Sequence, residues 1–133
     1  MIDIESSVFN RVRDAVLAQY PDAFIVGKEI RTPSKFPCVS IVESDNYALS
    51  RTQDSDSMEN HAYVMYEVNV YSTKKNTSKT ECKSIMQIVD TEFARIGFTR
   101  SMKRPLSMDD ATKFRIIARY TAVVGTDNKI YGR

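Results

Sequence analysis

The segment that most constrains the fold is a long alternating run near the C-terminus, residues 112–124. One set of alternate positions is apolar: Phe114, Ile116, Ala118, Tyr120, Ala122 and Val124. The positions between them are mixed: Arg115, Ile117, Arg119, Thr121 and Val123. A period of two is typical of a β-strand whose two faces meet different surroundings. We therefore expect a long strand with one face in the core. The second face, with Arg beside Ile and Val, suits contact with another protein.

Two helices are predicted from apolar stripes at helical spacing. The first covers residues 3–20 and ends at Pro21, because proline disfavours helix in the residue before it. The second begins at Ser78, where Ser78 and Glu81 have the spacing of a capping box. It ends at Gly97, a residue that readily adopts the left-handed conformation.

Shorter strands are predicted at residues 23–30, 38–43, 62–71 and 98–103, and a long polar stretch covers 45–61. The expected fold is α+β: a two-layer sandwich in a single domain, 1–133. It has one mixed, mostly antiparallel sheet of four to five strands, with both helices on one face. The other face is expected to stay uncovered by the chain itself, which suggests an oligomer or a docking surface. Its residues are Met65, Glu67, Asn69, Tyr71, Arg115, Ile117, Arg119 and Val123.

The net charge is small, but the charged residues are distributed unevenly along the chain. The net charge of +2 is too low to indicate nucleic-acid binding by itself. Residues 43–60 are mostly acidic, and residues 100–119 are mostly basic. Either the acidic segment of one copy meets the basic segment of another, or both are solvated faces. The acidic N-terminus predicts no secretory signal, and no apolar run approaches the ~18 residues needed to span a bilayer.

Nothing in the sequence indicates catalysis, so we expect no enzyme, metal or cofactor. The single histidine, His61, has no evident nucleophile, and Cys38 and Cys82 lack a Cys-x-x-Cys pattern. Both cysteines are expected to be buried and reduced. Residues 54–59 lack the glycine of a calcium loop, and the strand aromatics lack the RNA-binding consensus.

Several strand phrases follow one another in a recognisable order. After an amphipathic helix come FPCVSIVE (36–43) and YEVNVYS (66–72), then a second helix, RIIARYTAVV (115–124) and KIYGR (129–133). This pattern resembles the tail terminators and the related neck, tail-completion and head–tail joining proteins of tailed phages. The resemblance implies a structural virion protein whose activity is assembly. Such proteins form a ring, most often a hexamer, at the head-proximal end of the tail tube. The ring ends tube polymerisation and joins the tail to the neck and head.

The implied partners are further copies of the chain, the tail tube protein and neck or head-completion proteins. DNA would only pass through the lumen without specificity, and no membrane is involved. The location is the virion, with assembly in the host cytoplasm. The predicted subunit or tube interface contains Tyr47, Arg51, Asp54, Asp56, Glu59, Arg100, Arg104, Arg115 and Arg119, and the lumen candidates are Lys74, Lys75 and Lys79. The alternatives are another neck, connector or tail-completion protein, or a small nucleic-acid-binding module.

Overall fold

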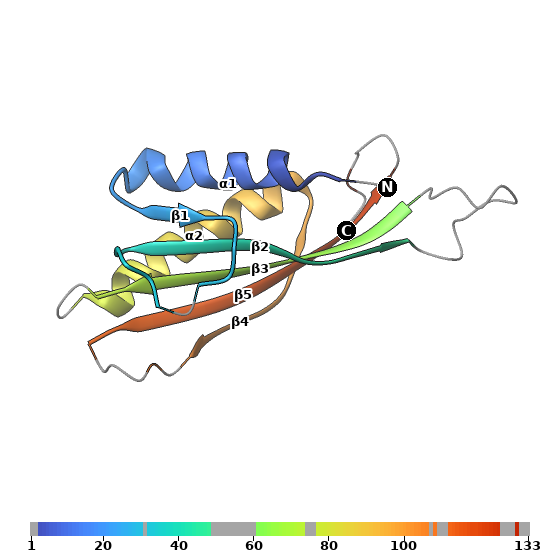
Figure 1. The fold of residues 1–133 in the computed structure, drawn as a ribbon. Helices are drawn as coiled ribbons and strands as arrows, with labels where there is room; N and C mark the ends of the chain where they lie inside the picture. The colour runs from blue at the N-terminus through green and yellow to red at the C-terminus, as the bar shows by residue number, and fades with distance from the viewer. Residues whose placement is uncertain are drawn as a thin grey trace, which may run out of the picture.

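The computed structural model describes residues 3–30, 32–48, 61–73, 77–106, 108, 112–125 and 130. Two helices and five strands follow one another along the chain (Figure 1). Their bounds are α1 Glu5–Gln19, β1 Phe24–Val26, β2 Cys38–Ala48, β3 His61–Ser72, α2 Ser78–Ile96, β4 Thr99–Leu106 and β5 Phe114–Gly125.

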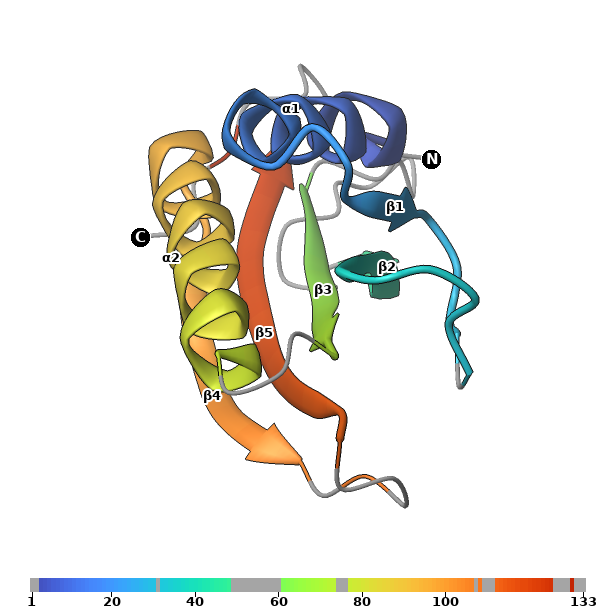
Figure 2. The same cartoon turned by 90° about the vertical axis from the view of Figure 1, so that its left-hand side faces the viewer.

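The strands form one sheet in the order β1-β2-β3-β5-β4. β1 pairs in parallel with β2, and the other three pairings are antiparallel. The predicted α+β fold with a mixed, mostly antiparallel sheet is therefore confirmed. Figure 2 shows both helices on the same side of the sheet, with α2 beside β5 and β4 and α1 nearer to β1.

The core lies between the helices and one face of the sheet. Val12 and Val16 of α1 and Phe93 of α2 are completely buried there. They meet the alternate positions of β5 that were predicted to face inward, among them Ala118 and Tyr120. The rings of Phe93 and Tyr120 stack with centroids 4.3 Å apart and an interplanar angle of 5°. Both apolar helix stripes thus pack on the same face of the sheet, as predicted.

Both ends of α2 lie where the sequence predicts them, but the predicted cap is confirmed only at the C-terminus. Gly97 ends the helix in the left-handed region, with φ at 113°, as expected for glycine at that position. The predicted capping box of Ser78 and Glu81 is wrong. Thr77 occupies the N-cap position and makes no side-chain cap bond. The Glu81 carboxylate instead accepts a 2.6 Å hydrogen bond from the Ser72 hydroxyl, which ties the start of α2 to the end of β3.

β2 is longer than predicted. The expected strand ends at Glu43, but pairing with β3 resumes after an irregularity between Glu43 and Asp45 and continues to Ala48. Residues 45–48, which the sequence placed in the long polar stretch between two strands, therefore belong to β2. The ends of β2, β3 and β5 extend together beyond the helices (Figure 1). We call residues 45–48, 61–64 and 122–125 the arm.

The sheet face directed away from the helices, here called the outer face, is partly covered by the connection between β1 and β2. The Tyr71 hydroxyl donates to the Ile30 carbonyl at 2.8 Å, and the Ser40 hydroxyl donates to the Lys28 carbonyl at 2.8 Å. The expectation that this face is uncovered is thus wrong for three of its residues. Asn69, Tyr71 and Ile117 are only 3%, 1% and 6% exposed.

Candidate interaction surface

The accessible remainder of the outer face lies on the arm and just below it. We call it the open patch; it consists of Tyr47, Tyr63, Met65, Glu67, Arg119 and Val123. Strand register makes these residues neighbours. Tyr63 lies opposite Tyr47 on β2 and opposite Val123 on β5. Neighbouring strands therefore present aromatic, aliphatic and charged groups on one surface.

The aromatic part of the open patch is a cross-strand pair. The rings of Tyr47 and Tyr63 are tilted by 32°, with centroids 5.2 Å apart. Such pairs stabilise antiparallel strands by about 0.2–1 kcal/mol relative to Ala–Ala. Tyr47 is nevertheless 49% exposed. Exposed tyrosine at a fixed position is typical of the central part of protein–protein interfaces.

The charged part of the open patch is the pair formed by Arg119 and Glu67. The Arg119 Nε lies 3.1 Å from a Glu67 carboxylate oxygen, and the two residues are direct cross-strand partners. Their side chains are 45% and 26% exposed. An ion pair this accessible contributes little to folding stability. Its main effect is to hold a guanidinium, which has five N–H donors, in a defined place on the surface.

Arg115 lies on the same face but is engaged within the chain. Its Nε donates to the Asn69 side-chain oxygen at 2.9 Å, and its guanidinium lies over the Tyr71 ring, 5.3 Å from the centroid. Burial raises the pKa of Tyr71, while the positive charge of Arg115 acts in the opposite direction. Arg115 therefore supports the covered half of the outer face and is not part of the open patch.

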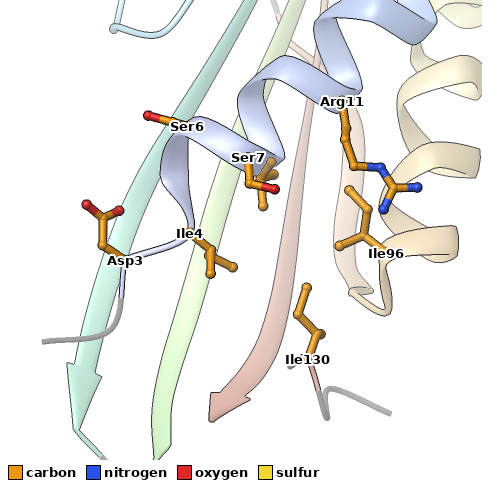
Figure 3. A pocket seen from close by; sticks show the side chains of 8 residues that line it. Asp3, Ile4, Ser6, Ser7, Arg11, Ile96 and Ile130 are labelled. Atoms are coloured by element: carbon orange, nitrogen blue, oxygen red, sulfur yellow. The ribbon is translucent and has the colours of Figure 1, made fainter. Parts of the chain in front are cut away.

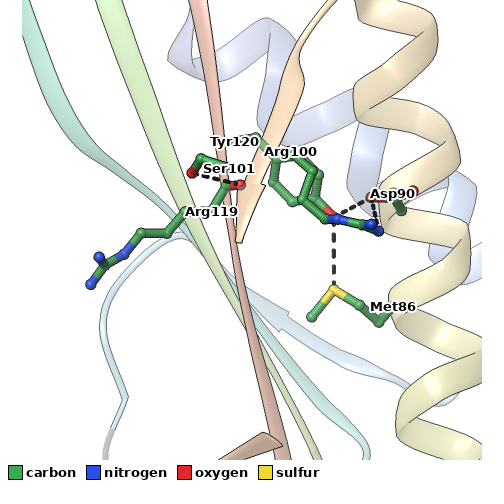
Figure 4. Close-up of polar contacts among 6 residues, drawn as sticks. All are labelled: Met86, Asp90, Arg100, Ser101, Arg119 and Tyr120. Atoms are coloured by element: carbon green, nitrogen blue, oxygen red, sulfur yellow. Dashed lines mark hydrogen bonds and ion pairs between the residues drawn. The ribbon is translucent and has the colours of Figure 1, made fainter. Parts of the chain in front are cut away.

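Arg100 points to the other side of the sheet, toward α2 (Figure 4). Its Nη1 lies 3.1 Å from an Asp90 carboxylate oxygen, which also accepts a 3.1 Å hydrogen bond from the Tyr120 hydroxyl. Burial raises the pKa of Tyr120, and the nearby Asp90 charge raises it further, so the phenol stays protonated as the donor. The structure does not bring Arg100 together with Arg119.

The remaining predicted site residues fall into two groups. Arg104 is exposed on β4, and Lys79 is exposed in the first turn of α2. The others lie outside the described residues: Arg51, Asp54, Asp56, Glu59, Lys74 and Lys75. Their assignment to an interface or a lumen stays a prediction.

Four members of the open patch, Tyr63, Met65, Glu67 and Val123, were not predicted as site residues, although all but Tyr63 were placed on the outer face. Tyr63 belongs to the open patch because it lies opposite Tyr47. The two residues can pair only if β2 extends past Glu43. A signal was available, because Tyr47 lies near the start of the polar stretch and Tyr63 just after its end, at positions that a hairpin would pair. Glu67 belongs to the open patch because the pairing of β3 with β5 places Arg119 directly opposite it.

A hollow separate from this surface lies where α1 begins and α2 ends, beside Ile130 (Figure 3). It is lined by Asp3, Ile4, Ser6, Ser7, Val8, Arg11, Ile96 and Ile130. The Arg11 guanidinium is already engaged, since it lies 3.0 Å from the mostly buried Glu92 carboxylate. Within the described ranges, no three His, Cys, Asp or Glu residues gather to hold a metal ion. No helix in this part of the chain is long and apolar enough to cross a membrane.

Comparison with known proteins gives structural similarity alone. No family model and no curated protein matches the sequence. A solved structure that has only a sequence identifier for a name matches with a TM-score of 0.58 and 13% identity, over 89% of this chain and 90% of that one. A sheath/tube terminator of an extracellular contractile injection system, in its extended state, gives a TM-score of 0.39 and 13% identity. That match covers 96% of this chain and 59% of the terminator. The chain therefore shares its fold with a solved protein of nearly equal extent.

Proposed function

We propose that this chain is a structural assembly protein of a tailed phage or phage-like particle. It forms a ring at the head-proximal end of the tail tube, ends tube polymerisation and joins the tail to the neck. The sequence resemblance is one support, and the open patch is the structural observation that carries the proposal. The sheath/tube terminator named above belongs to the class proposed here, but the support comes from this chain's own residues.

The open patch has the composition of a protein interface. Interfaces combine exposed aromatic residues and arginine with a central area from which water is excluded. Tyr47 supplies a large aromatic surface, and Arg119 supplies a guanidinium held by Glu67. Both stand on paired strands, so little conformational freedom would be lost when a partner binds.

Three arginines of the predicted basic segment argue against the nucleic-acid alternative. Arg100, Arg115 and Arg119 each make a side-chain contact with an acidic or amide group of their own chain. Nucleic-acid binding depends on cations that neutralise phosphates, and internal pairing reduces this capacity. A contact with protein therefore fits this surface better than a contact with phosphates.

The test combines light scattering and negative-stain imaging of the purified protein, with and without purified tail tubes. Closed rings, or caps at one end of the tubes, are expected. A strict monomer that ignores tubes at every concentration would overturn the proposal. Salt-dependent binding of DNA by that monomer would then support the nucleic-acid module.

A pair of variants connects the outcome to the open patch. Tyr47→Ser should weaken capping, because it removes the most exposed large apolar side chain among the described residues. Gln87→Ala is the matched control, since Gln87 is exposed on α2, on the opposite side of the sheet. Equal capping by both variants would remove Tyr47 from the interface.

A further inference from the structure

The sheet has two free edges in the described part of the chain. β4 pairs only with β5 and forms one edge. At the other edge, β1 is three residues long and pairs with β2 only at Cys38, Val39 and Ser40. The rest of β2, residues 41–48, has β3 on one side and no described strand on the other. Unpaired edges present N–H and C=O groups that can bind a further strand.

The two edges have opposite charge. β4 is largely exposed and basic, and its Lys103 and Arg104 both face solvent. The free part of β2 contains Glu43 and Asp45 and lies near Glu5 of α1. Burial raises the pKa of Glu43, and the negative charges of Glu5 and Asp3 raise it further. The electrostatic environment of this edge therefore favours an incoming positive charge.

We propose that β4 of one copy of this chain pairs with residues 41–48 of β2 in the next copy, so that the sheet continues between subunits. This interface rests on the proposed ring, for which it supplies the contact between neighbours. Charge decides which edges meet. If two β4 edges met, the lysine and arginine of one copy would face those of the other. If two β2 edges met, carboxylates would face carboxylates. Only contact of β4 with β2 brings opposite charges together.

This contact is heterologous, because two different surfaces of the chain meet. A heterologous contact closes into a ring when its rotation closes. Strand direction is compatible with such a ring. Since β2, β3, β5 and β4 are successively antiparallel, β4 runs opposite to β2 within one copy. Rotation about an axis along the strands keeps this relation, so β4 and the neighbour's β2 would also pair antiparallel.

The two edges also lie at matching levels of the sheet. Thr99 pairs with Thr121, which pairs with Met65, which pairs with Asp45. In the same way, Lys103 pairs with Ala118, which pairs with Val68, which pairs with Ile41. Residues 99–103 of β4 therefore lie level with residues 41–45 of β2.

Irregularities at both edges restrict pairing with other strands. Register shifts between Glu43 and Asp45 in β2, and between Arg100 and Met102 in β4. Pro105, which has no N–H, lies beyond the level segment of β4. Bulges, charged side chains and proline at an edge strand hinder its pairing with strands of other proteins. Here they leave the oppositely charged edge of a second copy as the favoured partner.

The test reverses the charge of each edge separately. The first variant is T99E with K103E, and the second is S44K with D45K; all four positions are exposed, and Thr99 lies level with Asp45. Each variant alone should stay folded by circular dichroism and remain monomeric by light scattering. Mixed in equal amounts, they should form rings in which the two variants alternate, because each reversed edge then meets an oppositely charged one. K83E with S84E is the control: it matches the charge change of the first variant at exposed α2 positions, and it should assemble like wild type.

Failure of this interface can be told apart from failure of the proposed function. If the wild type caps tubes and both edge variants do so as well, the edge contact is overturned and the terminator function stands. A mixture of folded variants that stays monomeric also overturns the edge contact. If both the wild type and the mixture form rings, but neither the wild type nor the mixture caps tubes, the edge contact stands and the terminator function is overturned. A strictly monomeric wild type overturns both.

Discussion

Arg119 lies directly opposite Glu67 across the pairing of β5 with β3, and its Nε donates a hydrogen bond to the carboxylate at 3.1 Å. On the same strand and the same face, Arg115 instead donates to the Asn69 side chain beneath the β1–β2 connection. The two arginines have the same chemistry and the same alternation, yet one belongs to an accessible surface and the other supports the fold. They should therefore respond differently to substitution.

Arg115→Ala should destabilise the protein more than Arg119→Ala. Without Arg115, the Asn69 side-chain oxygen loses its donor in a residue that is 3% exposed, at a cost of about 1–3 kcal/mol. Loss of the accessible Arg119 pair should cost less than about 1 kcal/mol. Urea unfolding of both variants measures the difference, and equal losses would contradict the separate roles. Tube capping should change in the opposite order, with Arg119→Ala affected directly.

Gly97→Ala should destabilise the protein for two independent reasons. The φ of 113° is a conformation that side-chain-bearing residues rarely adopt, and such strain costs on the order of 1–3 kcal/mol. An added Cβ would also lie 3.0 Å from the Ile130 Cγ2. Gly27→Ala is the matched control, because its Cβ would meet only ordinary contacts, the nearest at 3.6 Å to Phe9. Thermal unfolding should separate the two variants, and a neutral Gly97→Ala would contradict both the backbone strain and the close contact with Ile130.

Most of the fold could be predicted from the sequence because burial leaves a periodic trace. The alternation at 112–124 and the apolar stripes of both helices reflect burial against one face of the sheet, and the structure confirms each. The extension of β2 left no such trace, because the sequence Asp-Asn-Tyr-Ala at residues 45–48 does not alternate between polar and apolar side chains. Pairing with β3, the next strand along the chain, determines this part of the strand.

The candidate surface could be predicted only in outline. The mixed outer face was evident from alternation, but the chain covers part of it, and that cover depends on contacts such as Tyr71 with the Ile30 carbonyl. No periodic pattern encodes such a contact. For the same reason the sequence grouped Arg100 with Arg119. The irregularity in the β4–β5 pairing and the bond to Asp90 place Arg100 on the side of the helices.

The two cysteines should be inert in the native protein. Both are completely buried, and burial raises the pKa of Cys38 to about 11 and that of Cys82 to about 12. The thiolate is the reactive form, so native protein at neutral pH should react very slowly with a thiol reagent such as DTNB. Denaturing urea should release both thiols at once. Rapid stoichiometric labelling without denaturant would show that the sheet near Cys38 opens readily.

Glu43→Gln should stabilise the protein at neutral pH and lose this advantage on acidification. Burial raises the folded-state pKa of Glu43, and the charge on Glu5 raises it further, so folding favours the protonated carboxyl. For an acid with a raised folded pKa, this contribution to stability is fully present below the unfolded pKa and is lost as pH rises through the folded pKa. At neutral pH the wild type therefore has the full penalty of an ionised Glu43, and the glutamine variant does not. The amide oxygen introduced by the substitution can still accept the hydrogen bond that the Tyr66 hydroxyl now donates at 3.3 Å.

Urea midpoints of the two proteins, measured at neutral pH and at pH values below the ordinary glutamate pKa of 4.5, should converge as the pH falls. A difference that grows toward low pH would show that the ionised carboxylate is the form the fold prefers.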